Sequence, residues 1–389
     1  MYAFFSILTI VLISIVFLLS LEERKLSRTL QVWLFFCFSI FSVVLLSIRG
    51  FGLDYRNYKA MYSRLNIVLE PELLLIQDIE PLYATMNAVF RAAGSSFGFF
   101  YFSFNLMALL LIFIAYGKKY WSLKVLFIFL VLYYISYMDV TRAFMASCIF
   151  MLSIRFLSEK KYILSFFVLA ITPFAHYSAF VLVPFIFFIR FKFTIISYFT
   201  LLCLSLISGL LFDSNAKSLA GLFQHENNVE FVRSGINYLL KGSNSPKDGF
   251  FNYTHVISWF SITAFVPIFA IIVNAVFLFK SSEAHDTKIL YFHRLSCWGT
   301  LIFVFFVSAN SIVFGNRIYF LLSLGLPIIL IELIRSSGGR KKKKSRHVRA
   351  GYCNLEYVVW SFFMILGFIF VFSYVASFHV EGTFFYLGI

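Results

Sequence analysis

The feature that most constrains this chain is a series of long apolar runs separated by polar loops. Of its 389 residues, 61% are hydrophobic and only 13% are charged. Soluble domains contain roughly 25% charged residues, so this composition does not suit a fold surrounded by water. Several runs of about 18 or more apolar residues are long enough to cross a bilayer. We therefore predict an all-α fold, a polytopic integral membrane bundle with one transmembrane domain over residues 1–389.

About twelve runs are expected to form transmembrane helices. The first is interpreted as a retained helix rather than a signal peptide, because it lacks a basic leading segment and a small-residue cleavage site. The expected spans are residues 3–20, 31–48, 97–115, 124–138, 141–157, 162–175, 178–190, 194–212, 256–279, 295–313, 318–334 and 356–378.

The basic residues alternate along the chain and indicate its orientation. Short loops rich in lysine and arginine stay in the cytoplasm, and every second loop here is basic. The alternation predicts an even number of spans with both termini outside. The net charge of +15 then reflects membrane orientation and attraction to membrane lipid, not a nucleic-acid partner. The basic loops contain Arg24, Lys25, Arg28, Lys118, Lys119, Lys124, Lys160, Lys161, Arg190, Lys192, Lys280, Lys288, Arg294 and the cytoplasmic segment 335–355 with its RKKKKSR run.

Two long connections belong to the opposite, outer set of loops. Loop 49–97 contains GLDYRNYKAMY and IEPLYATMNAVFRAAG, and its apolar stretches at 65–76 and 82–90 are expected to be interfacial or re-entrant. Loop 213–255 contains two short amphipathic pieces, around 216–223 and 229–240, which favour a packed lid over disorder.

The sequence contains no motif for a metal or a nucleotide cofactor, and none is predicted. The five cysteines lie in apolar runs or beside a basic loop, at spacings that indicate neither a disulfide framework nor a zinc site. We expect small buried side chains at Cys37, Cys148, Cys203, Cys297 and Cys353. No internal repeat points to an inverted-repeat transporter.

The most informative stretch is the helical hairpin 139–178, with Arg142 at one end and His176 at the other. Because the two helices of the hairpin run antiparallel, these residues are expected at the same membrane face. An arginine at the end of an apolar helix needs a reason, and its planar fork matches a phosphate or diphosphate. The alternatives are pairing with Asp139, three residues earlier, or snorkelling to the surface.

Other polar residues are expected at the same outer face. His176 can accept a proton or donate to a substrate oxygen, or it can simply end a helix. Arg317, in FGNRIYF, is a second candidate cation for the same anion, with snorkelling as the alternative. Asp54 and Glu80 are either solvated loop carboxylates or groups that act as a general base or orient a sugar hydroxyl.

Four tyrosines accompany these residues. Tyr55, Tyr58 and Tyr83 neighbour the two acids, and Tyr177 follows His176. Tyrosines at an outer interface commonly form an aromatic belt, but they also provide stacking platforms for sugars. Both interpretations stay open for the four side chains.

The order of these motifs resembles the EpsG-like branch of the Wzy-type bacterial polysaccharide polymerases. The resemblance rests on G-x-D-Y-x-x-Y at 52–58, Glu80-Pro81, T-R-A-x-x-A around Arg142, His-Tyr-Ser at 176–178 and the late Arg317, and it extends to about residue 335. The family usually has Arg-Gln where this chain has Arg142-Ala143. This departure leaves the role of the arginine intact and puts that of its neighbour in doubt.

The resemblance implies an enzyme of the bacterial inner membrane that makes O-antigen, lipopolysaccharide or exopolysaccharide chains at its periplasmic face. A hydroxyl of one lipid-linked repeat unit attacks the growing chain on its undecaprenyl diphosphate carrier, which leaves. The implied site has Arg142 and Arg317 on the diphosphate and His176, Asp54 or Glu80 as the catalytic base, with no obligatory metal. A chain-length regulator and a flippase are the expected partners.

Two other functions fit an apolar bundle with polar outer ends. A flippase for lipid-linked oligosaccharides should place charges deep within its spans, whereas the isolated charges here lie at helix ends. An O-antigen ligase or an acyltransferase is the other alternative. A ligase shares the donor and much of the site, so only the motif resemblance favours the polymerase.

Overall fold

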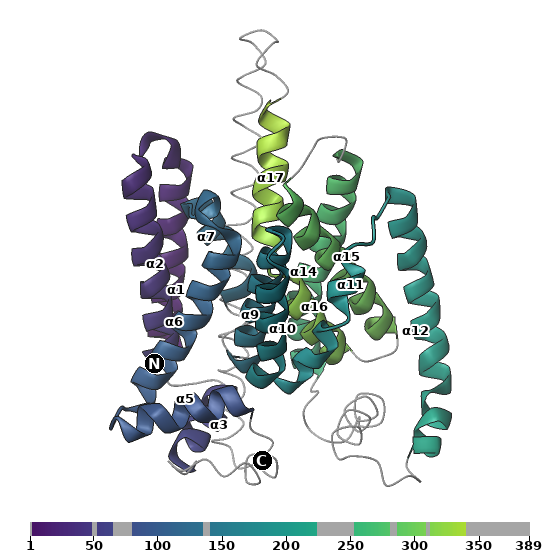
Figure 1. Ribbon diagram of the computed structural model, residues 1–389, viewed down its shortest axis with the longest axis horizontal. Helices are drawn as coiled ribbons and strands as arrows, with labels where there is room; N and C mark the ends of the chain where they lie inside the picture. The colour runs from purple at the N-terminus through teal and green to yellow at the C-terminus, as the bar shows by residue number, and fades with distance from the viewer. Residues whose placement is uncertain are drawn as a thin grey trace. The chain divides into compact units, whose positions relative to one another are not determined.

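A computed structural model describes residues 2–48, 53–64, 80–134, 141–223, 253–280, 286–308 and 312–339 (Figure 1). All secondary-structure elements in these ranges are helices. The chain divides into two compact units, Met1–Pro184 with Pro327–Ile389 and Phe185–Leu326. We describe each unit by itself.

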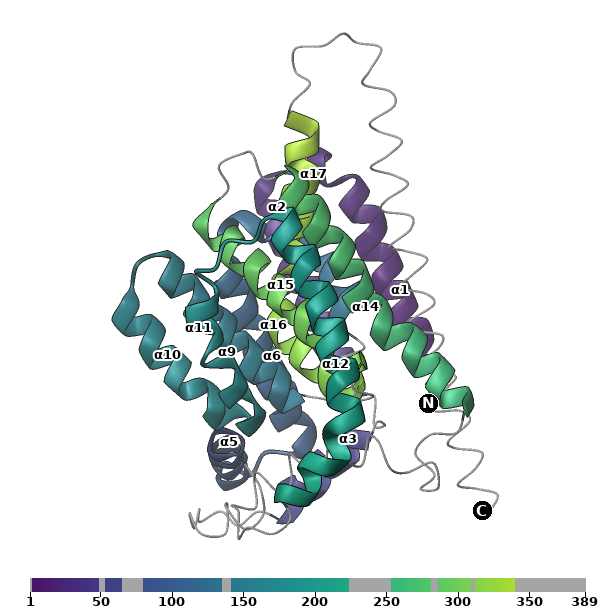
Figure 2. The ribbon, with the colours of Figure 1, turned by 90° about the vertical axis from the view of Figure 1, so that its right-hand side faces the viewer.

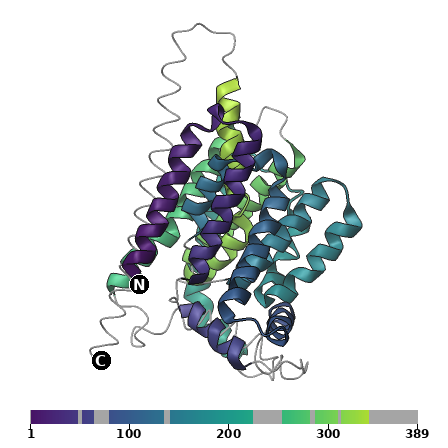
Figure 3. The same ribbon diagram turned by 90° about the vertical axis from the view of Figure 1, so that its left-hand side faces the viewer.

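The first unit is a bundle in which α6, α9 and α10 run side by side (Figures 2 and 3). Helices α1 and α2 pack on its other elements, α1 mainly against α7 and α2 mainly against α6. Its elements are α1 (Tyr2–Leu21), η1 (Glu23–Lys25), α2 (Arg28–Ile48), α3 (Leu53–Arg64), α5 (Pro81–Ala92), α6 (Phe97–Tyr116), η2 (Lys118–Tyr120), α7 (Leu123–Phe129), the π-helical η3 (Leu130–Tyr134), α9 (Thr141–Ser158), α10 (Tyr162–Ala175), η4 (Tyr177–Leu182) and α17 (Leu326–Gly339).

Serine caps fix where two of these helices begin. The Ser96 hydroxyl accepts a hydrogen bond from Phe99 N at the start of α6, and Ser122 does the same for Val125 N at the start of α7. Such caps satisfy backbone N–H groups that have no partner within the helix. Helix α6 ends at Gly117, whose φ of 83° suits glycine. These residues fix where α6 and α7 begin and where α6 ends.

A pair of serines joins α9 to α10 within the hairpin. The Ser153 hydroxyl donates to the Ser165 carbonyl at 3.0 Å, and the Ser165 hydroxyl donates to the Ser153 carbonyl at 2.9 Å. Both residues are buried. Small hydroxylated residues let apolar helices approach closely and hydrogen-bond across their interface. The reciprocal bonds therefore hold the two helices in one register.

Two helices occupy the part of loop 49–97 that the structure describes. Helix α3 carries the G-x-D-Y-x-x-Y motif, and α5 begins at Pro81, directly after Glu80. Proline at the first position suits a helix start because its fixed φ matches the helix and it needs no N–H partner. Figures 1 and 2 show α5 lying across the end of the bundle. The predicted interfacial stretch 82–90 is thus part of a helix, and stretch 65–76 lies outside the described residues.

The second unit contains α11 (Phe185–Phe188), α12 (Ile195–Phe223), α14 (Tyr253–Lys280), α15 (Thr287–Ser308) and α16 (Ile312–Ser323). A buried polar network links three of them. The hydroxyls of Tyr198 on α12 and Thr300 on α15 lie 2.8 Å apart, and the amide of Asn274 on α14 donates to Tyr198 at 3.5 Å. Paired polar side chains of this kind hold helices together where the surroundings are apolar.

Among the described residues, four helices are long and apolar enough to cross a membrane: α2, α6, α9 and α15. Six further stretches are apolar but shorter, with 10–17 residues each. The predicted all-helical integral membrane protein is therefore confirmed in this coarser form. Twelve complete spans stay a prediction, and the last of them, 356–378, lies outside the described residues.

Three of the predicted boundaries differ from the helix boundaries in the structure. The expected span 318–334 is interrupted between α16 and α17, because Pro327 starts a new helix and cannot continue an old one. At the same break a Cβ on Gly325 would lie 2.6 Å from Phe292 Cβ, so only glycine fits there. Helix α15 begins at Thr287 rather than residue 295, and α12 continues to Phe223, into the predicted lid 213–255.

Candidate functional site

Three segments of the first unit meet at the carboxylate of Glu80. One carboxylate oxygen, Oε2, accepts a hydrogen bond from Nη1 of Arg142, the second residue of α9. The other, Oε1, bonds to Nδ1 of His176, the residue that follows α10. Residues separated by 62 and 96 positions in the sequence are thereby joined through one side chain. We call Glu80, Arg142 and His176 the outer cluster.

The backbone around Glu80 and His176 explains why their side chains meet. Glu80 occupies the N-cap position of α5, and its carbonyl accepts from Ala84 N at 3.0 Å. Its side chain makes no cap bond and instead points to the cluster. His176 is extended, with φ −162° and ψ 125°, between α10 and η4. The Glu80 carboxylate and the His176 imidazole therefore both lie at helix ends, where the backbone direction changes.

Burial makes the charge of Glu80 depend on its partners. Its side chain is 3% exposed, against 17% for Arg142 and 26% for His176. Burial alone raises the pKa of the Glu80 carboxyl, but the hydrogen bond with His176 and the positive charge of Arg142 outweigh it. The net effect holds the pKa below its ordinary value of 4.5. Glu80 is therefore an ionised carboxylate at neutral pH.

The ionised carboxylate determines the tautomer of His176. A carboxylate only accepts hydrogen bonds, so Nδ1 of His176 must carry the hydrogen that points to Glu80. In the neutral imidazole the other nitrogen, Nε2, is then an acceptor. His176 is also the most exposed member of the cluster. The arrangement can take up a proton at Nε2 and stabilise the resulting positive charge through Glu80.

Two tyrosines flank the guanidinium of Arg142. Its central carbon lies 5.4 Å from the ring centre of Tyr58 and 5.7 Å from that of Tyr83. These are distances of cation–π contacts. Both tyrosines are buried, and the pKa of Tyr83 is raised, mainly by that burial. The Nε atom of Arg142 is buried and has no hydrogen-bond partner among the described residues.

Aromatic packing places α3 and α6 around these residues. The Tyr55 ring lies 5.3 Å from that of Tyr101 on α6, and the Tyr101 hydroxyl lies 3.0 Å from that of Thr141. Thr141 precedes Arg142 and is buried as well. Tyr101 and Thr141 were not among the predicted site residues. A tyrosine one turn into an apolar span and a threonine beside an arginine carry no signal of their pairing.

The structure describes the other predicted site residues only in part. Asp54 lies on α3 and Arg317 on α16 in the second unit, and their side chains are outside the described part of the chain. Tyr55 and Tyr177 are partly exposed, unlike Tyr58 and Tyr83. Asp139, the alternative partner for Arg142, also lies outside the described residues. The structure thus brings together Arg142, His176 and Glu80 with the tyrosines Tyr58 and Tyr83.

A third residue that was not predicted is Asn87, seven positions after Glu80 on the same face of α5. It is completely buried, and neither its amide nitrogen nor its oxygen has a partner among the described residues. Positions i, i+3 and i+7 share one face of a helix, which places Glu80, Tyr83 and Asn87 in one row. The spacing would have revealed this row if a helix had been predicted at α5.

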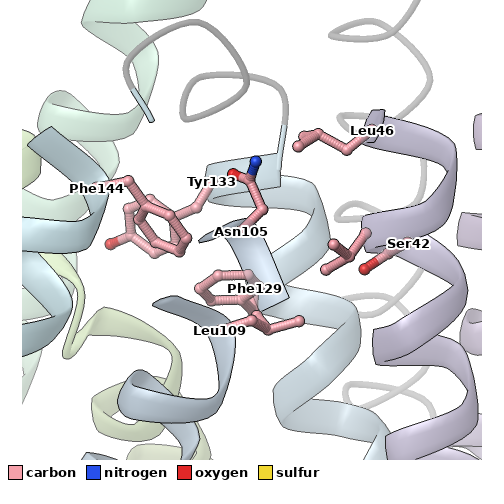
Figure 4. A pocket seen from close by; sticks show the side chains of 8 residues that line it. Ser42, Leu46, Asn105, Leu109, Phe129, Tyr133 and Phe144 are labelled. Carbon is pink, nitrogen blue, oxygen red and sulfur yellow. The ribbon is translucent and has the colours of Figure 1, made fainter. Parts of the chain in front are cut away.

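A small cavity of the first unit lies among α2, α6, α7, η3 and α9, and no residue of the outer cluster lines it. It measures about 30 Å³, which is room for about one water molecule. Figure 4 shows Ser42 and Leu46 of α2 facing Asn105, Leu109 and Phe129 across it. The walls are otherwise apolar, and the volume does not accommodate an isoprenoid tail. A larger hollow of about 310 Å³ lies between α12 and α15 in the second unit and has mostly apolar walls.

The lowered pKa of Glu80 predicts a loss of stability in acid. Because the folded state holds Glu80 ionised more strongly than the unfolded state, its contribution is complete above its ordinary value of 4.5. That contribution disappears as the pH falls from there through the pKa of the folded protein. We expect Glu80→Gln to lower the melting temperature in detergent at neutral pH by several degrees, about 2–4 °C per kcal/mol lost. The difference should shrink towards acid pH.

Differential scanning fluorimetry at several pH values measures this effect. Glu22→Gln is a suitable control, since Glu22 pairs with Lys25 on the surface at 2.5 Å and surface pairs contribute little. Equal melting curves for wild type and Glu80→Gln at neutral pH would contradict the prediction.

Comparison with known proteins gave one family. The model of the EpsG family matches residues 32–386 of this chain. A search of curated proteins and a search of solved structures found no match.

Proposed function

Because the chain belongs to the EpsG family, a family implicated in polysaccharide synthesis, we propose that it polymerises lipid-linked oligosaccharide repeat units. The donor is the growing chain on undecaprenyl diphosphate, and the acceptor is a hydroxyl of a new lipid-linked unit. The reaction takes place at the outer face of the bacterial inner membrane. It releases undecaprenyl diphosphate, and a flippase and a chain-length regulator are the proposed partners.

Arg142 is proposed to bind the diphosphate of the donor. A diphosphate leaving group gains negative charge in the transition state, and fixed positive groups placed beside it lower the barrier. The Arg142 side chain is 17% exposed and lies at the N-terminus of α9, where the helix dipole also favours an anion. Arg317 is proposed as the second cation, on the strength of the motif order alone.

His176 is the proposed base for the attacking hydroxyl. Of the three candidates, Glu80 is almost completely buried and both of its oxygens are occupied. His176 is partly exposed, and the Glu80 bond leaves its Nε2 as an acceptor. A general base must have such an atom within reach of the proton that it removes. Asp54 stays a candidate for orienting the acceptor sugar.

The four tyrosines are proposed to have two different roles. Tyr58 and Tyr83 are buried against the guanidinium and hold Arg142 in place. Tyr55 and Tyr177 are partly exposed and can stack on a sugar ring. Loop 213–255 is proposed to cover the acceptor and exclude water, because hydrolysis would otherwise compete with transfer.

The observation that carries this proposal is the buried carboxylate that joins an arginine and a histidine from the two ends of one helical hairpin. Buried ionisable groups in a membrane protein are costly and commonly mark functional sites. A flippase has no need for an oriented imidazole beside a cation at one membrane face. Glycosyl transfer from a diphosphate needs both.

Surface polysaccharide from cells with and without the chain tests the proposed class of reaction. We expect long ladders with the chain and products with a single repeat unit without it. A second test supplies purified protein in liposomes with lipid-linked repeat units. Movement of these lipids across the bilayer without new glycosidic bonds would favour a flippase. Transfer of preformed chains to lipid A without growth of those chains would favour a ligase.

A further inference from the structure

Glu80 holds two groups that the proposed reaction needs at different moments. Its Oε2 pairs with the Arg142 guanidinium, and its Oε1 pairs with the His176 imidazole. The side chain is 3% exposed, so water contributes little to the solvation of its charge. When the imidazole is neutral, the negative charge of Glu80 is balanced by Arg142. A cation that is already balanced attracts a second anion weakly.

The proposed reaction creates one positive and one negative charge within the site. The acceptor oxygen forms a bond to the anomeric carbon and gives its proton to His176 Nε2. The bond from that carbon to the diphosphate breaks, and its electron pair leaves with the diphosphate oxygen. One positive charge therefore appears on His176 and one negative charge on the diphosphate. Both charges appear beside partners of Glu80.

Resting on the proposed function, we propose that Glu80 is a positioning residue that couples proton uptake by His176 to release of Arg142 for the leaving diphosphate. Once His176 is positively charged, it balances Glu80. The Arg142 guanidinium is then free to balance the negative charge that forms on the diphosphate. The two charges that transfer creates, one on His176 and one on the diphosphate, then each have a partner within the cluster, and pairing is what makes buried charges tolerable.

The groups around the carboxylate agree with this exchange. Two ionisable groups beside the outer cluster are Tyr58 of α3 and Tyr83 of α5, whose ring centres lie 5.4 and 5.7 Å from the central carbon of the guanidinium. Tyr101 of α6 packs against Tyr58 at 6.3 Å. Burial raises the pKa of Tyr83, so it stays neutral and does not compete as an anion. The Glu80 carboxylate thus contacts both the Arg142 guanidinium and the His176 imidazole.

Binding of undecaprenyl diphosphate to the purified full chain in nanodiscs tests the coupling without requiring turnover. In the wild type, affinity should rise by up to about tenfold per pH unit from about pH 8 to about pH 6, as one proton binds with the product. Glu80→Gln removes the negative charge that balances Arg142, so it should bind the product more tightly than wild type at about pH 8, and its affinity should depend less on pH. His176→Asn keeps a donor for Glu80 but takes up no proton, so it should bind weakly throughout.

In His176→Asn, the slope of affinity against pH reports only the protonation of the ligand itself. A steeper slope in the wild type than in this variant is what supports the coupling. Glu80→Asp retains the charge and should retain the steeper slope. Parallel slopes in wild type, Glu80→Gln and His176→Asn would overturn the coupling, as would weaker binding by Glu80→Gln at about pH 8. If the wild type binds no product and makes no polymer, the proposed function itself fails. If the wild type makes polymer but its affinity depends on pH as weakly as that of the two variants, only the coupling fails.

Discussion

Arg142→Ala is expected to abolish long-chain polysaccharide while the protein still inserts into the membrane. Loss of one group that stabilises charge in a transition state commonly lowers the rate by about 10²–10³-fold. Here the loss also leaves the buried Glu80 carboxylate without its cation. Arg142→Lys keeps the charge but not the planar fork, so we expect a smaller but clear reduction. A gel of surface polysaccharide measures both effects.

Arg155→Ala is the matched control for this experiment. Arg155 lies on the same helix, and its guanidinium bonds to Glu159 and the Ile114 carbonyl rather than to the outer cluster. We expect near-normal chains from this variant. Arg142→Ala combined with Glu80→Gln removes the orphaned charge and separates lost binding from misfolding. Arg317→Ala is expected to shorten the chains as Arg142→Ala does. Normal ladders from both arginine variants, at normal protein levels, would rule out the proposed diphosphate site.

His176→Ala is expected to lower polymerisation by about 10²–10⁴-fold at unchanged expression, the usual contribution of a positioned general base. The physical reason is the loss of Nε2, the acceptor that Glu80 leaves free by binding Nδ1. The rate of chain growth in liposomes, measured with purified donor and acceptor lipids, gives the magnitude. A gel of cell-surface material gives the direction.

His347→Ala, in the predicted cytoplasmic loop 335–355, serves as the control for a lost histidine and should grow normal chains. His176→Asn should be as slow as His176→Ala, because asparagine can hydrogen-bond Glu80 but cannot take up a proton. If either His176 variant makes chains of nearly normal length, His176 is a structural residue at the end of α10 and the base must be sought elsewhere.

The meeting of Arg142 and His176 could be predicted because it depends on local features. Both residues end apolar runs, and the basic turn between the runs is short, so an antiparallel hairpin places them at one end. The helical class followed in the same way from composition. These inferences require only helix length and the direction of the chain.

The role of Glu80 could not be predicted in this way. Its partners lie 62 and 96 residues further along the chain, and a carboxylate beside proline in a polar loop is usually solvated. Its burial depends on α5 lying across the end of the bundle, which the apolar pattern of that loop did not reveal. The burial of Tyr58 and Tyr83 beside Arg142 could not be predicted for the same reason.

The serine pair between α9 and α10 bears on how accurately the outer cluster is assembled. Ser153 follows Arg142 by eleven residues, and Ser165 precedes His176 by eleven, so the hairpin has two arms of equal length, about 16 Å each. A slip of one residue between the helices would move one arm by about 1.5 Å and turn it by about 100°. The hydrogen bonds between two small hydroxyl groups, far from the outer cluster, thus help to place the arginine and the histidine at the same height in the bundle.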